Sequence, residues 1–141
     1  MLISDFPRLL ITDDDGAFRE TLRSVFAPRG FQTLTAADGD EALEIVAKQP
    51  VHVLLTDMHM PRLNGLETIR RIRERRLILP CILLSGGVDD GLLEEARGLQ
   101  AFSVLPKPVR FAELTGVVCQ ALRITYGWQP DESNSGDSRD T

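Results

Sequence analysis

Four apolar segments of the chain each end in polar residues that could take part in chemistry. The first segment ends in three consecutive aspartates at 13–15, and later segments end in Asp57, Ser85 and Lys107. Carboxylates gathered in one place repel one another unless a cation joins them, and hard oxygen ligands suit Mg²⁺ better than zinc or copper. A lysine adds a fixed positive charge for an anionic ligand, and a serine adds a hydroxyl donor. Together these residue types predict phosphoryl transfer, with a strand-end carboxylate as the acceptor.

The segments between these residues alternate between strand and helix. Strands are predicted at 8–12, 31–36, 51–56, 80–84 and 101–105. Helices are predicted at 17–27, between Asp38 and Pro50, and at 66–75, 89–98 and 111–124. Several of these strands are apolar throughout, which is typical of strands buried on both faces of a parallel sheet. The sequence therefore predicts an α/β fold, a doubly wound five-stranded parallel sheet with helices on both faces.

In doubly wound sheets, function gathers at the carboxyl ends of the strands, beside the point where the strand order reverses. We therefore expect Asp13, Asp14, Asp57, Ser85 and Lys107 to lie at one edge of the sheet. The third aspartate of the first motif directly precedes the first helix, so an N-cap is its better interpretation.

The composition indicates one globular domain and excludes several classes of protein. The 141 residues carry 21 acidic and 16 basic side chains, and this net charge of −5 disfavours binding to nucleic acid. No apolar run approaches the roughly 18 residues of a membrane span, and the N-terminus lacks the features of a signal peptide. Cys81 and Cys119 have no metal-type spacing and indicate a reducing compartment, the cytoplasm.

The negative charge is concentrated at the C-terminus. Residues 129–141 carry four acidic side chains against one arginine and contain no aliphatic or aromatic residue. We expect an N-terminal extension at 1–7, a domain at 8–125 and a disordered acidic tail at 126–141. We expect no attached output domain, because neither predicted end segment is long enough to form one. Whether the chain is a fragment of a longer protein stays open.

Four motifs occur at the ends of the predicted strands. They are LLITDDD at 9–15, TDMHMPRLNG at 56–65, LLSG at 83–86 and LPKP at 105–108. Each is weak evidence alone, but together they have the order and spacing of response-regulator receiver domains of two-component signalling. The chain resembles a single-domain receiver over residues 8–125. This resemblance implies a flavodoxin-like sheet with strand order 2-1-3-4-5.

The resemblance assigns a metal site to the first two motifs. Asp13 and Asp14 would hold Mg²⁺ together with Asp57, Asp14 directly and Asp13 through water. His59 would add its main-chain carbonyl, and its imidazole would not be a ligand.

The resemblance also assigns the phosphate contacts. Asp57 would be the phosphoacceptor, and Lys107 would pair first with Asp57 and then with phosphate. Ser85 would donate its hydroxyl to the phosphoryl group, and Gly86 would give it a backbone N–H.

These roles imply a signalling switch. A histidine kinase or histidine phosphotransfer protein would supply the phosphoryl group from a phosphohistidine. The surface formed by the helix at 89–98, the strand at 101–105 and the helix at 111–124 would then change and bind a downstream effector protein. The resemblance also allows a phosphorylation-dependent homodimer. We expect no direct contact with nucleic acid or membrane, and no enzymatic activity beyond self-catalysed phosphoryl transfer and autodephosphorylation.

Two other functions compete with this interpretation. A phosphatase of the haloacid dehalogenase type also uses a strand-end aspartate, but it typically carries a second aspartate where this chain has His59. A receiver-like module that accepts no phosphate is the other alternative, and the complete set of strand-end residues argues against it.

Several further residues have simpler interpretations. His52 is expected to be a partly exposed histidine at the start of a strand, and the arginines at 70–76 a solvated helix face. Asn64 stands where the family more often has aspartate. Val104 stands where the family commonly has an aromatic residue, with Phe102 expected on the same side of the strand.

Overall fold

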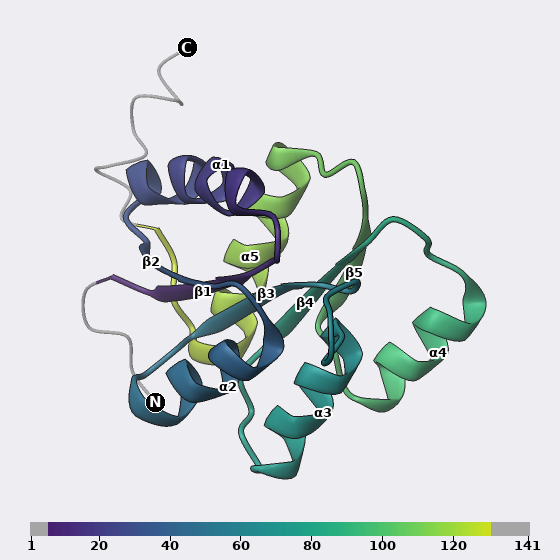
Figure 1. Cartoon of the computed structure of the whole chain (residues 1–141). Coiled ribbons are helices and arrows are strands. Elements are labelled where there is room, and N and C mark those ends of the chain that lie inside the picture. The colour runs from purple at the N-terminus through teal and green to yellow at the C-terminus, as the bar shows by residue number, and fades with distance from the viewer. Residues whose placement is uncertain (1–5, 131–141) are drawn as a thin grey trace.

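The computed structural model describes residues 6–130, which form a five-stranded sheet flanked by helices. The strands are β1 (Arg8–Thr12), β2 (Gln32–Ala36), β3 (Val53–Asp57), β4 (Cys81–Ser85) and β5 (Ser103–Pro106). All neighbouring strands pair in parallel, and their order is β2-β1-β3-β4-β5 (Figure 1). The predicted doubly wound, flavodoxin-like sheet is therefore confirmed.

Five α-helices connect the strands and cover both faces of the sheet. They are α1 (Gly16–Phe26), α2 (Gly39–Lys48), α3 (Gly65–Glu74), α4 (Asp90–Gly98) and α5 (Phe111–Tyr126), with a short 3-10 helix η1 (Ala27–Arg29) after α1. Helices α1 and α5 lie on one face, and α2, α3 and α4 lie on the other (Figure 1). No described helix has both the length and the apolar composition needed to span a membrane.

Alternate residues of each central strand enter two different cores. Leu9 and Ile11 of β1 pack with Phe26 beneath α1 and α5, whereas Leu10 packs with Ile69 beneath α2 and α3. All five residues of β3 and all five of β4 are buried. A strand with helices on both faces needs apolar side chains on both faces. This burial explains why the sequence of these strands does not alternate.

The helix starts are set by side-chain caps. Asp15 accepts hydrogen bonds from the N–H groups of Ala17 and Phe18, which confirms its interpretation as an N-cap. Asn64 caps α3 in a capping box, because its amide oxygen accepts from Glu67 N–H while the Glu67 carboxylate accepts from Asn64 N–H. An aspartate at position 64 would accept the same hydrogen bond from the Glu67 N–H. The neutral Asn64 therefore caps α3 as the aspartate common in the family would.

Four of the five arginines at 70–76 are exposed, as predicted for a solvated face, but Arg73 of α3 is not. Its guanidinium donates to four main-chain carbonyls, those of Leu77, Leu79, Leu99 and Gln100, at 2.8–3.1 Å. The planar fork of arginine can reach several acceptors at once. Arg73 therefore joins the end of α3 to the segment before β4 and to the segment after α4.

The prediction of a partly exposed His52 is wrong. The residue is 7% exposed, and its Nδ1 accepts a hydrogen bond from the N–H of Arg8 at 2.8 Å. The hydroxyl of Tyr126 donates to the main-chain carbonyl of His52 at 2.9 Å. These bonds tie the first residue of β1, the segment before β3 and the end of α5 together. Sequence spacing does not reveal them because the three residues are far apart in the chain.

The folded part of the chain continues past residue 125, the end of the predicted domain. Helix α5 runs to Tyr126, and the ring of Trp128 lies 5.8 Å from that of Phe31 (centroid to centroid). Aromatic packing on the core holds this segment, so the last part of α5 belongs to the fold. Residues 131–141 of the acidic tail predicted at 126–141, and residues 1–5 of the N-terminal extension predicted at 1–7, lie outside the described residues.

Candidate functional site

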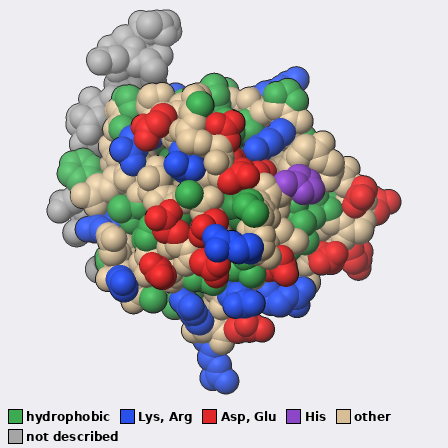
Figure 2. All heavy atoms as spheres, viewed as in Figure 1, with side chains coloured by type: hydrophobic (Ala, Val, Ile, Leu, Met, Phe, Trp, Pro, Cys, Tyr) green, Lys and Arg blue, Asp and Glu red, His purple; other side chains and the backbone are tan. Residues whose placement is uncertain are grey.

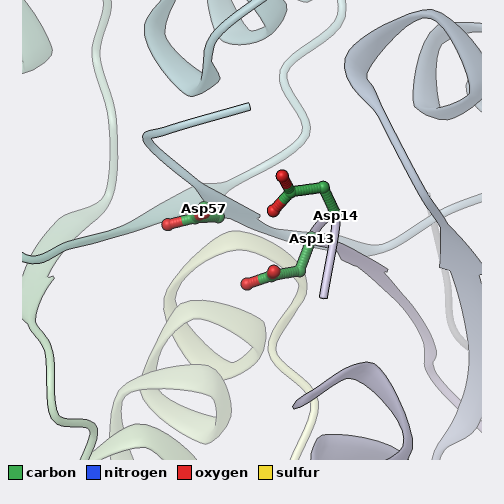
Figure 3. A group of neighbouring side chains, drawn as sticks. All are labelled: Asp13, Asp14 and Asp57. Carbon is green, nitrogen blue, oxygen red and sulfur yellow. The ribbon is translucent and has the colours of Figure 1, made fainter. Parts of the chain in front are cut away.

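The acidic residues meet because the first and third strands are neighbours. Thr12 of β1 lies opposite Thr56 of β3 in the parallel register. The residues that follow, Asp13 and Asp57, therefore leave the sheet side by side. Asp14 comes from the same loop as Asp13, and the three side chains cluster at the strand ends (Figure 3).

The three carboxylates form one compact group. Ligand oxygens from Asp13, Asp14 and Asp57 all lie within 4.8 Å of one another. Asp13 and Asp57 are 2% and 6% exposed, whereas Asp14 is exposed to solvent. The group is thus buried on one side and open on the other, which leaves an approach for a ligand.

Lys107 lies against the two buried carboxylates. Its Nζ is 3.1 Å from Oδ1 of Asp57 and 3.2 Å from Oδ2 of Asp13. The lysine directly follows β5, and its main-chain N–H donates to the carbonyl of Ser85 at the end of β4. This bond and the strand register bring the side chain of Lys107 from the outermost strand, β5, to the carboxyl ends of the central strands. The peptide bond between Lys107 and Pro108 is cis.

Burial and charge shift the ionisation of this group. Burial raises the pKa of the Asp13 carboxyl above its usual value, and the negative charge of Asp57 raises it further. The hydrogen bond from the Asp15 N–H and the contact with Lys107 lower this pKa but do not cancel the rise. Burial alone would lower the pKa of Lys107, but its hydrogen bond to Asp57 and the charges of both aspartates outweigh burial and raise it. Lys107 is therefore a permanent cation at neutral pH.

Ser85 lies at the end of β4 but does not contact the carboxylates through a hydrogen bond in the described structure. Its buried hydroxyl donates to the carbonyl of Gly87 at 3.1 Å and lies 3.2 Å from the Gly87 N–H. A Cβ at Gly86 or Gly87 would meet open space. The loop after β4 is therefore held by its own serine and is not packed against neighbouring atoms at these glycines.

Gly65 and His59 border the Asp57 loop. A Cβ at Gly65 would lie 2.5 Å from the main-chain oxygen of Asp57 and 2.5 Å from Cδ1 of Leu83, so only glycine fits there. The side chain of His59 is exposed. Among residues 6–130, no hydrogen bond occupies the main-chain oxygen of His59, which leaves it available as a ligand.

Two residues of α1 reach the site although the sequence assigns them no role there. The ring of Phe18 lies under the ammonium of Lys107, with Nζ 4.7 Å from the ring centroid. Arg19 donates from its guanidinium to the main-chain carbonyl of Asp13 at 2.7 Å. Helical periodicity places Phe18 on the apolar face of α1. Its contact with Lys107 could not be predicted from that periodicity, because it depends on where the loop after β5 lies in the folded structure.

The expectation for Phe102 is wrong. Val104 packs against the core beneath α2, α3 and α4, whereas Phe102 packs against the core beneath α1 and α5. Strand β5 begins at Ser103, so Phe102 precedes the strand and does not share the alternation that places Val104. Phe102 therefore does not replace an aromatic side chain at the Val104 position.

The donor set fits a hard divalent cation. Three carboxylates against the one ammonium of Lys107 leave a formal excess of negative charge in a half-buried site. Carboxylate oxygens with an open, solvent-facing side are what Mg²⁺ requires, because it keeps several waters when bound. Soft sulfur ligands are distant from this group, since Cys81 is a buried core residue and Cys119 lies on α5.

A parallel sheet of order 2-1-3-4-5 with an acidic group and a lysine at its carboxyl edge defines a doubly wound α/β domain whose charged edge suits a divalent cation and an anionic ligand. A model of the response regulator receiver domain matches residues 9–118. The chain belongs to the response regulator receiver domain family of two-component signalling.

Individual relatives agree with this assignment. Response regulator MprA of Mycobacterium leprae (strain TN) is 39% identical over 128 residues, which cover 89% of this chain and 54% of that protein. MprA of Mycobacterium ulcerans (strain Agy99) is 39% identical over 120 residues, covering 84% of this chain and 51% of that protein. The chain thus spans about half the length of the curated relatives that it matches.

Solved structures share the fold. Vibrio cholerae chemotaxis protein CheY4 superposes with a TM-score of 0.79 at 25% identity, covering 83% of this chain and 99% of CheY4. A response regulator receiver protein from Pseudomonas putida gives 0.79 at 29% identity, covering 84% and 99%. Receiver domains work as phosphorylation-dependent switches that bind Mg²⁺ at an acidic pocket, and they interact with histidine kinases and downstream effectors.

Proposed function

We propose that Asp57 accepts a phosphoryl group from a phosphohistidine of a histidine kinase or histidine phosphotransfer protein. The observation that carries this proposal is the joint contact of Lys107 with Asp57 at 3.1 Å and with Asp13 at 3.2 Å. A carboxylate acts as the nucleophile when an aspartyl phosphate forms, and the ammonium of Lys107 is a cation beside it. The same cation lies where the negative phosphoryl oxygens arrive.

The transfer is a substitution at phosphorus. An oxygen of the Asp57 carboxylate forms a bond to phosphorus while the bond from phosphorus to the phosphohistidine nitrogen breaks, and the electron pair of that bond stays on the imidazole. Lys107 then contacts a phosphoryl oxygen, and the hydroxyl of Ser85 leaves Gly87 to donate to another. Gly86 adds its N–H. No base is needed, because the nucleophile is already an anion.

Asp13, Asp14, Asp57 and the main-chain oxygen of His59 would hold Mg²⁺. When bound, the ion neutralises charge on the transferring phosphoryl oxygens. Both carboxylate oxygens of Asp13 already accept hydrogen bonds, from the N–H of Asp15 and from Lys107. The carboxylate of Asp14 is exposed and carries no such bonds among the described residues. This difference supports a direct contact for Asp14 and a water-mediated one for Asp13.

The output of the switch is a change of the surface formed by α4, β5 and α5. Ser85 precedes the loop into α4, and Lys107 follows β5 in the loop into α5, so movement of these side chains bears on the loops before both helices. The surface includes the exposed apolar side chains of Leu93 and Phe111. It also includes α4, whose acidic side chains lie at the right of Figure 2. A downstream effector protein that binds it would need an apolar contact rimmed by basic groups. A phosphorylation-dependent homodimer is a second form of output.

We further propose that the domain is a switch and not a turnover enzyme. His59 occupies the position two after Asp57 where phosphatases of the haloacid dehalogenase type carry their second aspartate. The chemistry of the domain is thus limited to self-phosphorylation and autodephosphorylation. The cytoplasm, where receiver domains usually work, is the proposed compartment.

A direct phosphorylation assay tests this function. The purified chain is incubated with Mg²⁺ and a small acyl phosphate, and the modified residue is mapped by mass spectrometry. We expect one phosphoryl group on Asp57, which disappears in Asp57→Asn and without divalent cation. Modification elsewhere, or sustained hydrolysis of a generic phosphate ester, would contradict the proposal.

A further inference from the structure

The ring of Phe18 completes the surroundings of the Lys107 ammonium. Nζ lies 4.7 Å from the ring centroid, well within the roughly 6 Å at which an ammonium interacts with a ring face. The carboxylates of Asp57 and Asp13 contact the same nitrogen at 3.1 Å and 3.2 Å. At this separation no water fits between the ammonium and the ring. The ammonium therefore has a fixed neighbour in addition to the two carboxylates.

Lys107 needs such a neighbour because its side chain is long. Four methylene groups separate the ammonium from the backbone, and the side chain is 30% exposed. When a phosphoryl group forms on Asp57, the Lys107–Asp57 pair must loosen. The ring keeps its contact with the ammonium while the carboxylate partner changes, since a cation–ring interaction does not depend on the protonation or modification of the aspartates.

Phe18 is also held by contacts that do not involve Lys107. Its N–H donates to the capping carboxylate of Asp15, and its ring packs against the core beneath α1 and α5. The ring therefore approaches Lys107 from a rigid support and not from a mobile loop. Rigid support is what distinguishes a positioning contact from an incidental one.

We propose that Phe18 is a positioning residue for phosphoryl transfer, acting through its ring face on Lys107. The inference rests on the proposed function of Asp57 as phosphoacceptor. The ring restricts the ammonium to the space between Asp57 and Asp13, so that the lysine is in place when the phosphoryl oxygens arrive. In this proposal Phe18 acts through Lys107 and would touch neither the phosphoryl group nor the metal.

The test compares ring and non-ring side chains at position 18 in the full chain. Phe18→Leu keeps an apolar side chain and removes the ring face, and Phe18→Tyr keeps the face. We expect Phe18→Leu to slow phosphorylation of Asp57 by a small acyl phosphate about tenfold and Phe18→Tyr to restore the rate to within about twofold. Val25→Ala, which trims the same apolar core from the same helix, should lower stability without slowing the reaction.

Two further measurements separate positioning from packing. In the Lys107→Gln background, Phe18→Leu should cause no additional loss of rate, because the ring has no ammonium to hold. By NMR, the Lys107 methylene protons next to the ammonium should show a ring-current shift that Phe18→Leu removes and Phe18→Tyr keeps. An equal loss of rate in both backgrounds would overturn the inference, as would an unchanged rate in Phe18→Leu.

The inference and the proposed function fail in different ways. If the unaltered chain is never phosphorylated on Asp57, the proposed function fails and the inference fails with it. If the unaltered chain is phosphorylated on Asp57 while Phe18→Leu reacts at the same rate, only the inference fails.

Discussion

The ammonium nitrogen of Lys107 lies 3.1 Å from Oδ1 of Asp57, so the end of β5 contacts the end of β3 across the intervening strand β4. The same nitrogen is 3.2 Å from Asp13. One cation therefore serves two buried carboxylates, and Asp14 adds a third negative charge nearby. The site is short of positive charge before any ligand arrives, and this shortage leads to the first prediction.

Asp13→Asn is expected to stabilise the cation-free protein by about 1 kcal/mol at neutral pH, the usual size of the gain when a functional residue that costs stability is replaced. Burial raises the pKa of the Asp13 carboxyl above 3.8, so its ionised form costs folding free energy. This cost is absent below pH 3.8 and appears as the pH rises through the folded-state pKa. Urea unfolding followed by the fluorescence of Trp128, the single tryptophan, measures the difference.

Magnesium should reverse this advantage. Bound cation stabilises only the folded state, and the unaltered site binds it more tightly than the variant site. Saturating Mg²⁺ should therefore raise the unfolding free energy of the unaltered chain more than that of Asp13→Asn. Equal stabilisation of both chains by Mg²⁺ would argue against Asp13 as part of the metal site.

Gly65→Ala is expected to destabilise the domain by about 2–3 kcal/mol. The added Cβ would lie 2.5 Å from the Asp57 main-chain oxygen and from Leu83, so backbone or core must shift. Gly116→Ala is the matched control, because a Cβ there meets nothing within 4 Å and the residue lies inside α5. The control should gain up to about 1 kcal/mol through helix propensity. Denaturant midpoints of the two variants should move in opposite directions.

Arg73→Lys is expected to lower the unfolding free energy by about 2 kcal/mol. A lysine ammonium cannot reach the four carbonyls that the guanidinium joins, those of Leu77, Leu79, Leu99 and Gln100. Arg76→Lys, at an exposed position beyond the end of α3, should change stability by less than about 0.5 kcal/mol. Thermal or urea unfolding compares the two, and equal effects would show that the fork of Arg73 adds nothing.

The stability of the domain should fall as the pH drops below 6.5 because of His52. Burial, and then the charge of Arg8, lower the pKa of His52 from 6.5, so the fold favours neutral imidazole. The contribution of neutral His52 to the unfolding free energy is present above pH 6.5 and is lost as the pH falls toward the folded-state pKa. Over this range the unfolding free energy falls by up to about 1.4 kcal/mol per pH unit. Protonation also removes the acceptor for the N–H of Arg8.

His52→Asn isolates this effect, since its side-chain oxygen can accept the same hydrogen bond but does not titrate. The unfolding free energy of the variant should be flatter between pH 5 and pH 7 than that of the unaltered chain, whatever its absolute stability. If the unfolding free energies of the two proteins changed in parallel with pH, His52 would not be the cause of the pH dependence.

Much of the fold and part of the site followed from local sequence. Continuous apolar segments that end in polar residues predict buried parallel strands, and a doubly wound sheet then places Asp13, Asp57, Ser85 and Lys107 at its carboxyl edge. Asp15 was predictable as a cap because capping depends only on neighbouring residues. Local chemistry and strand periodicity suffice for these features.

Contacts between distant segments needed the tertiary structure. Phe18 and Lys107 are brought together by the packing of α1 beside the end of β5, and helical periodicity alone assigns Phe18 to the core. The hydrogen bonds of Arg73 and His52 depend on carbonyls and N–H groups that only the folded backbone presents. The sequence by itself determined which residue types end the strands. Strand register and helix packing decided which of them touch, because contact depends on distances through space that spacing along the chain does not contain.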